Sequence, residues 1–451
     1  MMCFCRGTPQ GVGVSIICIK ALLCVSILLV MVSRPEARTW NILVDGTGDA
    51  PTIQAGIDSS GTGDEVLVHS GTYFENIDFL GKDIVVRSQT GPQGTVIDGS
   101  RKDDSVVVFV SGEPVTTRLE GFTIQGGVGR EFPEAENRGG GGVLIIDSSP
   151  VIDGNIIRDN NTGTINGWGG GLLMDSSRYD IEFPTPWIVN NVFERNRCTM
   201  NGGGISATGV RSRVEGNVFR ENEARFDGGG MYLAMDGAGS IEIRNNQFWE
   251  NVAGDHGGGI EFGSQGQAEP ALLEFNLFVR NEAHGNDLPS DSGTGGGVAM
   301  RGWEGTIRNN TFADNVGTGG NGCTGGALLL TGSERVVVVE NNLFFSSHGC
   351  GVVCRFGAEG VTVRNNLFWG NDPYDIHEPP ECSIGLVENN MFDVDPLLCG
   401  PEMDNYTVSN QSPALAANPP IGMWVNPGCG DGVPVESTTW GRIKVRFRDG
   451  E

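Results

Sequence analysis

Lysine is almost absent from this sequence of 451 residues, with only four copies, at positions 20, 82, 102 and 444. Lysine and arginine together supply 30 positive charges against 56 negative ones, a formal net charge of −26. A chain this acidic lacks the basic surface that nucleic acids require. It should also repel polyanionic sugars unless a cation bridges them. The composition therefore excludes nucleic acid as a partner.

Long hydrophobic runs are also missing, apart from one near the N-terminus. Residues 21–33 read "ALLCVSILLVMVS", which suits the core of a signal peptide and is short for a membrane span. We predict that residues 1–37 form a signal peptide; the alternative is an uncleaved anchor extended back through residues 16–19. Both alternatives predict a secreted or cell-surface protein of the cell envelope or outer membrane, which meets a membrane only through this segment.

Cysteine spacings typical of metal sites do not occur, because no Cys-x-x-Cys or Cys/His pattern is present. An exported chain permits disulfides. Cys350 and Cys354 should lie about 13 Å apart on a strand, too far to bond to each other. Pairing among the cysteines after the leader is left open, and their odd number leaves at least one unpaired: Cys198, Cys323, Cys350, Cys354, Cys382, Cys399 and Cys429.

What the sequence does contain is a repeat rich in Asn, Phe and Gly. One copy of the repeat reads "NNQFWEN" at 245–251, and similar segments recur along the chain. A glycine cluster such as "GGG" at 257–259 follows most copies. The shared asparagine falls 24 to 36 residues apart, at positions 155, 191, 217, 246, 276, 310, 342, 366 and 390. The phenylalanine that follows it stands at positions 193, 219, 248, 278, 312, 344, 368 and 392.

This spacing predicts an all-β solenoid. Repeats of this length indicate a solenoid or a propeller, and the copies lack the apolar period of helices and the length of propeller blades. Three short strands fit in each copy, which makes one coil of a single-stranded parallel β-helix. Parallel crossovers should be right-handed. We predict about twelve coils, with a short capping helix at residues 52–59.

Each repeated residue type has an expected structural role. We expect the repeated asparagines to turn the corners in the left-handed conformation and to stack in a hydrogen-bonded ladder. The phenylalanines should point inward and stack, each burial contributing roughly 1.5–3 kcal/mol. The glycines should turn the third corner without colliding with the next coil.

The predicted organisation has five parts. The leader covers residues 1–37, and an N-terminal cap follows at 38–63. The β-helix occupies 64–395, a C-terminal closing segment 396–435, and a tail 436–451.

Two stretches resemble known families. "PTIQAGIDSSGTGDEVLVHSGTYFENIDFLGKDIVV" at 51–86 resembles the first coils of pectin-lyase-like β-helices, where a short helix caps the open end. Over about 155–371, Phe-x-x-Asn followed by Gly-Gly-Gly-Ile is similar to repeats of chlamydial polymorphic membrane proteins. These resemblances imply a right-handed β-helix and an exported location, and they imply little about activity, because many functions share this fold.

A catalytic site is only weakly indicated. The strand after the glycines should turn one row of side chains outward, with Glu261 beside Arg301 on adjacent coils as a cross-strand ion pair. The best candidate edge joins Asp227, Asp255 and His256 to Glu261. It could supply acid/base groups or a calcium site, whereas acids in glycine-rich corners are more often turn formers. We therefore expect no catalytic residues and no cofactor, with calcium left open.

Tryptophans in or near corner loops offer stacking surfaces for sugars. Trp168, Trp187 and Trp303 lie there, and Trp249 and Trp369 follow the stacked phenylalanines; packing against the coils is the favoured alternative for all of them. We predict an exported, non-catalytic β-helix with an adhesion-like or glycan-binding role, whose partner is a polysaccharide or cell-surface glycan. The alternative is a carbohydrate-active enzyme, a lyase or hydrolase, with a divergent site.

Overall fold

The computed structural model describes residues 37–429, except for 133–135, 164–165, 177–183, 235–239, 264–269, 286–294, 319–322, 332–335, 356–357, 380–381 and 425. The predicted leader and the predicted tail lie outside the described residues. No helix in the described part of the chain is long and apolar enough to cross a membrane.

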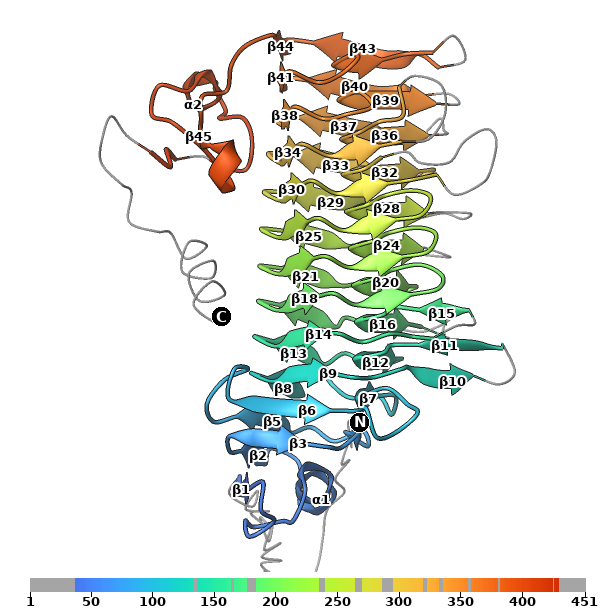
Figure 1. Ribbon diagram of the computed structural model, residues 1–451, viewed down its shortest axis with the longest axis vertical. Helices are drawn as coiled ribbons and strands as arrows, with labels where there is room; N and C mark the ends of the chain where they lie inside the picture. The colour runs from blue at the N-terminus through green and yellow to red at the C-terminus, as the bar shows by residue number, and fades with distance from the viewer. Residues whose placement is uncertain are drawn as a thin grey trace, which may run out of the picture. The chain divides into compact units, whose positions relative to one another are not determined.

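The coils stack their strands into three long parallel sheets, as Figure 1 shows. Sheet A has 13 strands and starts with a strand at Thr39, inside the segment predicted as the cap. Its strands are β1 (Thr39–Ile42), β2 (Glu65–Val68), β5 (Val85–Ser88), β8 (Arg118–Glu120), β13 (Val151–Asp153), β17 (Trp187–Val189), β21 (Arg213–Glu215), β25 (Glu242–Arg244), β29 (Ala271–Glu274), β33 (Gly305–Arg308), β37 (Val337–Glu340), β40 (Ala358–Arg364) and β43 (Ile384–Glu388).

Sheet B contains the repeated phenylalanines. Successive strands pair in register, so that Phe219 stands directly between Phe193 and Phe248. Its 12 strands are β3 (Gly71–Tyr73), β6 (Thr95–Asp98), β9 (Thr123–Gln125), β14 (Ile156–Arg158), β18 (Val192–Glu194), β22 (Val218–Arg220), β26 (Gln247–Trp249), β30 (Leu277–Val279), β34 (Thr311–Ala313), β38 (Leu343–Phe345), β41 (Leu367–Trp369) and β44 (Met391–Phe392).

Sheet C follows the glycine clusters. Its inward residues, such as Leu172 and Ile205, are fully buried in the core that the three sheets enclose. Its 11 strands are β4 (Ile77–Asp78), β7 (Val107–Phe109), β12 (Val143–Ile146), β16 (Leu172–Asp175), β20 (Ile205–Thr208), β24 (Met231–Ala234), β28 (Ile260–Gly263), β32 (Val298–Arg301), β36 (Leu328–Thr331), β39 (Val352–Arg355) and β42 (Ile376–His377).

Three smaller sheets complete the β structure. A corner sheet consists of β19 (Arg197–Cys198), β23 (Glu223–Ala224), β27 (Val252–Ala253), β31 (Glu282–Ala283) and β35 (Val316–Gly317). A side sheet consists of β10 (Arg130–Phe132), β11 (Asn137–Gly139) and β15 (Gly167–Trp168). The third is the hairpin of β45 (Leu398–Gly400) and β46 (Asn405–Val408).

The predicted capping helix is confirmed as α1 (Ile53–Ser59). The Thr52 hydroxyl accepts the Ala55 backbone N–H at 3.1 Å and so caps its N-terminus. Gly56 lets the helix pack closely on the first coil, because a Cβ there would lie 2.8 Å from Ile42 Cδ1.

The asparagine ladder is confirmed, and it is double. One ladder uses the predicted positions: Asn217, for example, donates its backbone N–H to Asn246 Oδ1 at 2.9 Å and its Nδ2 to the same oxygen at 3.0 Å. The second uses the asparagine that ends most of the repeats, as between Asn222 and Asn251. Both ladders are buried, so they satisfy corner backbone groups that water cannot reach.

The conformational part of that prediction is wrong. The left-handed residue is the one before each ladder asparagine, for example Asn245 at φ 55° before Asn246 and Glu250 at φ 53° before Asn251. The corner bends at the preceding residue, which leaves the ladder residue free to donate both its backbone and side-chain N–H to the next coil. Phe275 fills the bending position in one coil, so the ladder residue is required more strictly than the bending residue.

The phenylalanine stack and the glycine corner are both confirmed. Neighbouring rings lie nearly parallel, with centroids 4.6 Å apart for Phe219 and Phe248. In the glycine clusters, Gly228 adopts φ 69° and Gly229 has no room for a Cβ, which would lie 2.5 Å from Val252 O of the next coil. The stack ends at Phe392, which is 45 % exposed.

Of the seven cysteines after the predicted leader, six form disulfides: Cys323–Cys350, Cys354–Cys382 and Cys399–Cys429. Cys198 is buried and free, and Cys350 and Cys354 bond to other partners and not to each other, as predicted.

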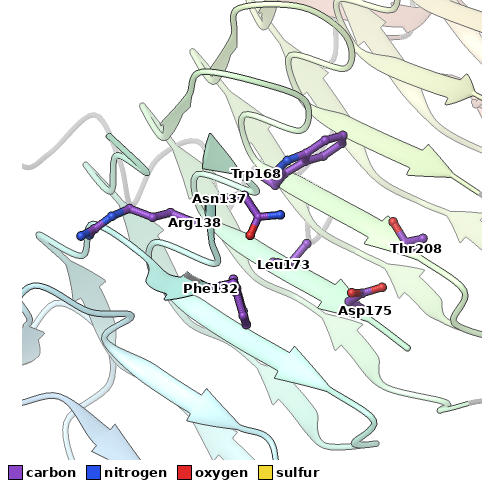
Figure 2. Close-up of a pocket in the computed structure, with 7 residues that line it drawn as sticks. All are labelled: Phe132, Asn137, Arg138, Trp168, Leu173, Asp175 and Thr208. Atoms are coloured by element: carbon purple, nitrogen blue, oxygen red, sulfur yellow. The ribbon is translucent and has the colours of Figure 1, made fainter. Parts of the chain in front are cut away.

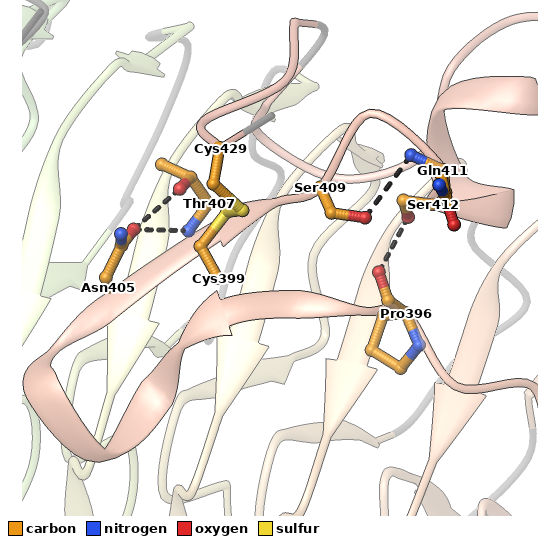
Figure 3. Close-up of a disulfide and its surroundings, with 8 residues drawn as sticks. All are labelled: Pro396, Cys399, Asn405, Thr407, Ser409, Gln411, Ser412 and Cys429. Carbon is orange, nitrogen blue, oxygen red and sulfur yellow. Dashed lines mark hydrogen bonds between the residues drawn. A yellow bond between two sulfur atoms is a disulfide. The ribbon is translucent and has the colours of Figure 1, made fainter. Parts of the chain in front are cut away.

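The closing segment after β44 packs on the outward face of sheet B. It contains the β45–β46 hairpin, a short 3-10 helix (Pro401–Met403) and α2 (Pro413–Ala416), and Cys399–Cys429 ties its two ends together (Figure 3). Tyr406 donates its hydroxyl to Asp314 Oδ2 at 2.8 Å, and its ring makes an edge-to-face contact with the Trp249 ring. This face of the β-helix is therefore covered over the later coils.

Candidate functional site

The outward face of sheet C was predicted as the place for a site, and the register confirms which residues share it. Leu173, Ser206, Tyr232 and Glu261 form one row over four coils, and Asp175 and Thr208 belong to the next. Farther along the same row, Ala299, Leu329 and Val353 are buried in one cluster with Cys323 and Cys350, which form a disulfide.

The open part of this face is a cleft beside the side sheet. The β10–β11 hairpin stands next to sheet C, and β11 pairs in parallel with β15 of the next coil. Gly139 allows this close approach, because a Cβ there would lie 2.2 Å from Leu173 Cδ2. The cleft has a volume of about 370 Å³ and is lined by Phe132, Asn137, Arg138, Trp168, Leu173, Asp175 and Thr208 (Figure 2).

The cleft has an apolar floor with aromatic side chains around it. Leu144 and Leu173 are buried on the outward face of sheet C, and the partly buried Phe132 and Trp168 pack against them. The Trp168 ring also meets the ring of Tyr232, with centroids 6.0 Å apart. The β11–β15 pairing fixes the backbone at Trp168, so its ring is held on a sheet and not on a free loop.

Polar groups complete the lining. The Asp175 carboxyl lies over sheet C, where burial, with a smaller contribution from the Asp147 charge, raises its pKa; the Ser176 backbone N–H opposes the shift. Figure 2 shows Thr208 next to Asp175, and Asn137 on the far side of Leu173, nearer Trp168. The cleft therefore combines apolar surfaces with donors and acceptors at its edge.

The structure brings together part of the candidate edge that the sequence predicts around Asp227 and Glu261. Arg301 reaches across from β32 and donates Nη2 to Asp227 Oδ2 at 3.1 Å and Nε to Glu261 Oε1 at 2.5 Å, which confirms the cross-strand ion pair. His256 Nδ1 lies 3.1 Å from Asp227 Oδ1. Asp255 is nearly buried in the same turn, with its backbone N–H donated to Phe226 O at 2.8 Å.

Electrostatics in this charged cluster of Asp227, His256, Glu261 and Arg301 are internally balanced. Burial disfavours the Asp227 carboxylate, but the His256 hydrogen bond and the Arg301 charge outweigh it and hold its pKa below the usual range. Burial also disfavours protonated His256, yet Asp227 raises its pKa overall. Burial raises the pKa of Glu261 to about 7, against the opposing charge of Arg301. The four side chains pair with one another, and Glu261 is fully buried.

Metal binding has little support in the described residues, where no group of three or more His, Cys, Asp or Glu side chains could hold an ion. The calcium site that the sequence leaves open gains no ligand set from this part of the chain.

The tryptophans separate into packed and open ones. Trp303 is 1 % exposed and lies edge-on against Phe262, and Trp249 is covered by Tyr406, so packing is confirmed for both. Trp187 is 42 % exposed on sheet A. Trp168 alone of the five lines the described cleft.

Sequence reasoning missed the hairpin that makes the cleft. Phe132, Asn137 and Arg138 lie in an insertion before the first recognised repeat, so no periodicity marks them. The alternation in "REF" and the turn-forming "PEAEN" between two short segments are the available signal of a hairpin.

Comparisons with known proteins address the fold. No curated protein matches the chain in sequence. Among solved structures, a complex of XylC with xylose is 11% identical, with a TM-score of 0.45 over 80% of this chain and 87% of that one. The catalytic domain of an alpha-1,3-glucanase in complex with tetrasaccharides is 13% identical, with a TM-score of 0.38 over 75% and 67%. A mannuronic acid specific polysaccharide family 6 lyase from human gut microbiota is 14% identical, with a TM-score of 0.36 over 82% and 93%.

None of these three resembles the chain closely enough to indicate its activity, and the resemblance to chlamydial polymorphic membrane proteins stays a prediction. The family model described as a right-handed beta helix region matches residues 104–270 and 234–392, which together span well over half of the 451 residues. The chain therefore belongs to the right-handed β-helix family, as both its repeat and its stacked sheets indicate.

Proposed function

We propose that this protein binds a glycan in the cleft between the side sheet and sheet C, without cleaving it. The observation that carries the proposal is the cleft itself, a hollow of about 370 Å³ in which Phe132 and Trp168 adjoin Asp175 and Thr208. Sugar rings present apolar C–H faces and hydroxyl edges. Aromatic faces match the former, and a few placed polar groups match the latter.

The lack of a second carboxyl group among the described lining residues favours binding over catalysis. Glycoside hydrolysis uses two carboxyl groups about 5–10 Å apart. Among the described residues that line the cleft, Asp175 is the only acid. The acids of the charged cluster are already engaged with Arg301 and His256.

A carbohydrate-active enzyme is the second candidate, and one observation favours it. Asp175 lies in the cleft with a raised pKa, which is the property of a general acid. An enzyme of this kind should release products from a polysaccharide and should lose that activity in Asp175→Asn.

The test is binding of a panel of oligosaccharides by isothermal titration calorimetry. Trp168→Ala should weaken binding about 5- to 150-fold, since stacking and burial at one aromatic side chain contribute on the order of 1–3 kcal/mol. Trp187→Ala is the matched control, because Trp187 is exposed on sheet A, away from the cleft. Equal loss in both variants, or product release from any polysaccharide, would contradict non-catalytic binding at this site.

Export is part of the proposal, with a cell-surface, adhesion-like role. The three disulfides support it, because such bonds persist in oxidising compartments. Residues 1–33 fused to a reporter should carry it across the inner membrane. Retention of the reporter in the cytoplasm would contradict export, and an intact N-terminus on the mature chain would favour the anchor.

A further inference from the structure

Arg138 is the only cation among the described residues that line the cleft, and its charge is already used. Nη1 and Nη2 pair with the two carboxylate oxygens of Asp103 at 2.6 and 2.9 Å, and Nη2 also pairs with Glu131 Oε2 at 3.2 Å. The same contacts hold the pKa of Asp103 below its usual range and raise that of Arg138. A guanidinium recognises a carboxylate by this two-pronged geometry, and here Asp103 occupies it.

The remaining charge of the cleft is negative. Asp175 is partly buried over sheet C, and the trio of Arg138, Asp103 and Glu131 has one more acid than base. A ligand carboxylate that entered the cleft would lose water, would find no unpaired cation among the described lining residues, and would lie near a like charge. Neutral sugars avoid this cost and can donate hydroxyls to Asp175.

We infer that the cleft selects glycans without carboxylate or sulfate groups, and that Asp103 and Glu131 enforce this selection by occupying Arg138. The inference rests on the proposed function, since it assigns a ligand class to the same cleft. It also makes a prediction about residues at the edge of the cleft: removing the two acids should convert Arg138 into a carboxylate receptor.

The experiment compares neutral oligosaccharides with oligouronates of the same length by isothermal titration calorimetry. Neutral ligands are drawn from xylo-, gluco- and manno-oligosaccharides, and uronates from galacturonate, mannuronate and guluronate oligomers. The wild type should bind at least one neutral series ten times more tightly than any uronate. In Asp103→Asn/Glu131→Gln, uronate affinity should rise about tenfold, and the gain should shrink as salt is added.

Two controls isolate the cause. Adding Arg138→Gln to the double variant should remove the gain, because the receptor is then gone. Asp393→Asn/Glu402→Gln removes the same two charges at exposed positions on the last coil and the closing segment. It should leave uronate affinity unchanged if the local cleft, and not the net charge of −26, rejects anions.

The outcomes separate this inference from the proposed function. Uronate binding in the wild type that equals or exceeds neutral binding and is lost in Trp168→Ala would overturn the selection and leave glycan binding standing. No gain in the double variant, with its circular dichroism spectrum intact, would overturn the role of Asp103 and Glu131. Absence of binding to every glycan would overturn both proposals.

Discussion

Asn246→Ala should destabilise the β-helix strongly, because this side chain bonds two backbone groups of the preceding coil. Its Oδ1 accepts the Asn217 backbone N–H at 2.9 Å, and its Nδ2 donates to Val214 O at 2.9 Å. Both groups are buried with the side chain, which is 0 % exposed. Alanine leaves the Asn217 N–H without a partner and removes one hydrogen bond from the Val214 carbonyl, which β25 still pairs in the sheet.

The magnitude follows from those two groups. The unpartnered N–H costs about 1–3 kcal/mol and the lost bond to Val214 O about 0.5–1.5 kcal/mol, so the free energy of unfolding should fall by roughly 2–4 kcal/mol. The other ladder contacts survive: Asn217 Nδ2 still donates to Ile188 O, and Asn276 Oδ1 still accepts the backbone N–H of residue 246. The loss is therefore confined to one step of the ladder.

Two further variants make the test specific. Asn390→Ala removes the same kind of contacts at the ladder's last step, where Asn390 is only partly buried and water can replace it; the loss there should be about 1 kcal/mol. Asn246→Asp keeps the acceptor but places a carboxylate oxygen against the Val214 and Asn276 oxygens. It should cost at least as much as alanine at neutral pH and less in acid, where the carboxyl can donate.

The assay is urea denaturation followed by far-ultraviolet circular dichroism, together with amide hydrogen exchange at Asn217. Exchange is needed because coils contact mainly their neighbours, so unfolding can be local. The reasoning is refuted if Asn246→Ala and Asn390→Ala shift the midpoint equally, or if Asn217 keeps its protection in Asn246→Ala.

Three other substitutions test the core, the glycine corner and the charged cluster. Phe248→Ala should cost about 3–5 kcal/mol, and Phe392→Ala much less because that ring is 45 % exposed; equal midpoints would contradict the stacked core. Gly229→Ala should prevent normal folding, since its Cβ would lie 2.5 Å from Val252 O, whereas Gly61→Ala, with only a contact at 3.9 Å, should be tolerated in soluble expression. The pKa of Glu261 is raised to about 7 from 4.5, so between these pH values the folded state keeps a proton that the unfolded state releases, and stability should fall as pH rises. Glu261→Gln should flatten that fall when denaturation is measured at several pH values. An unchanged slope in this variant would refute the assignment of the fall to Glu261.

The fold could be predicted because its causes are local and repeated. An asparagine that recurs nine times, eight of them two residues before a phenylalanine, allows the repeats to be aligned, and the alignment gives the coil, the ladder and the inward face. The alignment could not show which residue turns the corner by adopting the left-handed conformation. Asn245 and Asn246 are identical in type, and only the structure shows that the first takes φ 55° while the second donates to the next coil.

The cleft could be predicted only in part, for a related reason. Trp168 was assigned to a corner from the repeat alone, and the strand after the glycines was expected to turn a row of side chains outward. Phe132 and Arg138 come from a hairpin outside the repeat, and their position beside Leu173 depends on the lack of a side chain at Gly139. Likewise, the burial of Glu261 and Val353 depends on which loops cover the sheet, and loop paths do not follow from period.

A strict repeat cannot by itself make a binding site of unlike residues. Identical coils place the same side chain every 4.8 Å or so along a face, as the phenylalanine and asparagine columns do. A site therefore has to arise where the repeat is interrupted. The longest spacing between ladder asparagines, 36 residues from Asn155 to Asn191, is the coil that supplies Trp168, Leu173 and Asp175, and the hairpin insertion precedes it directly. The regular coils hold these insertions in place, and the insertions supply the unlike side chains that a binding site needs. The proposed function is therefore assigned to the cleft and not to the charged cluster farther along sheet C.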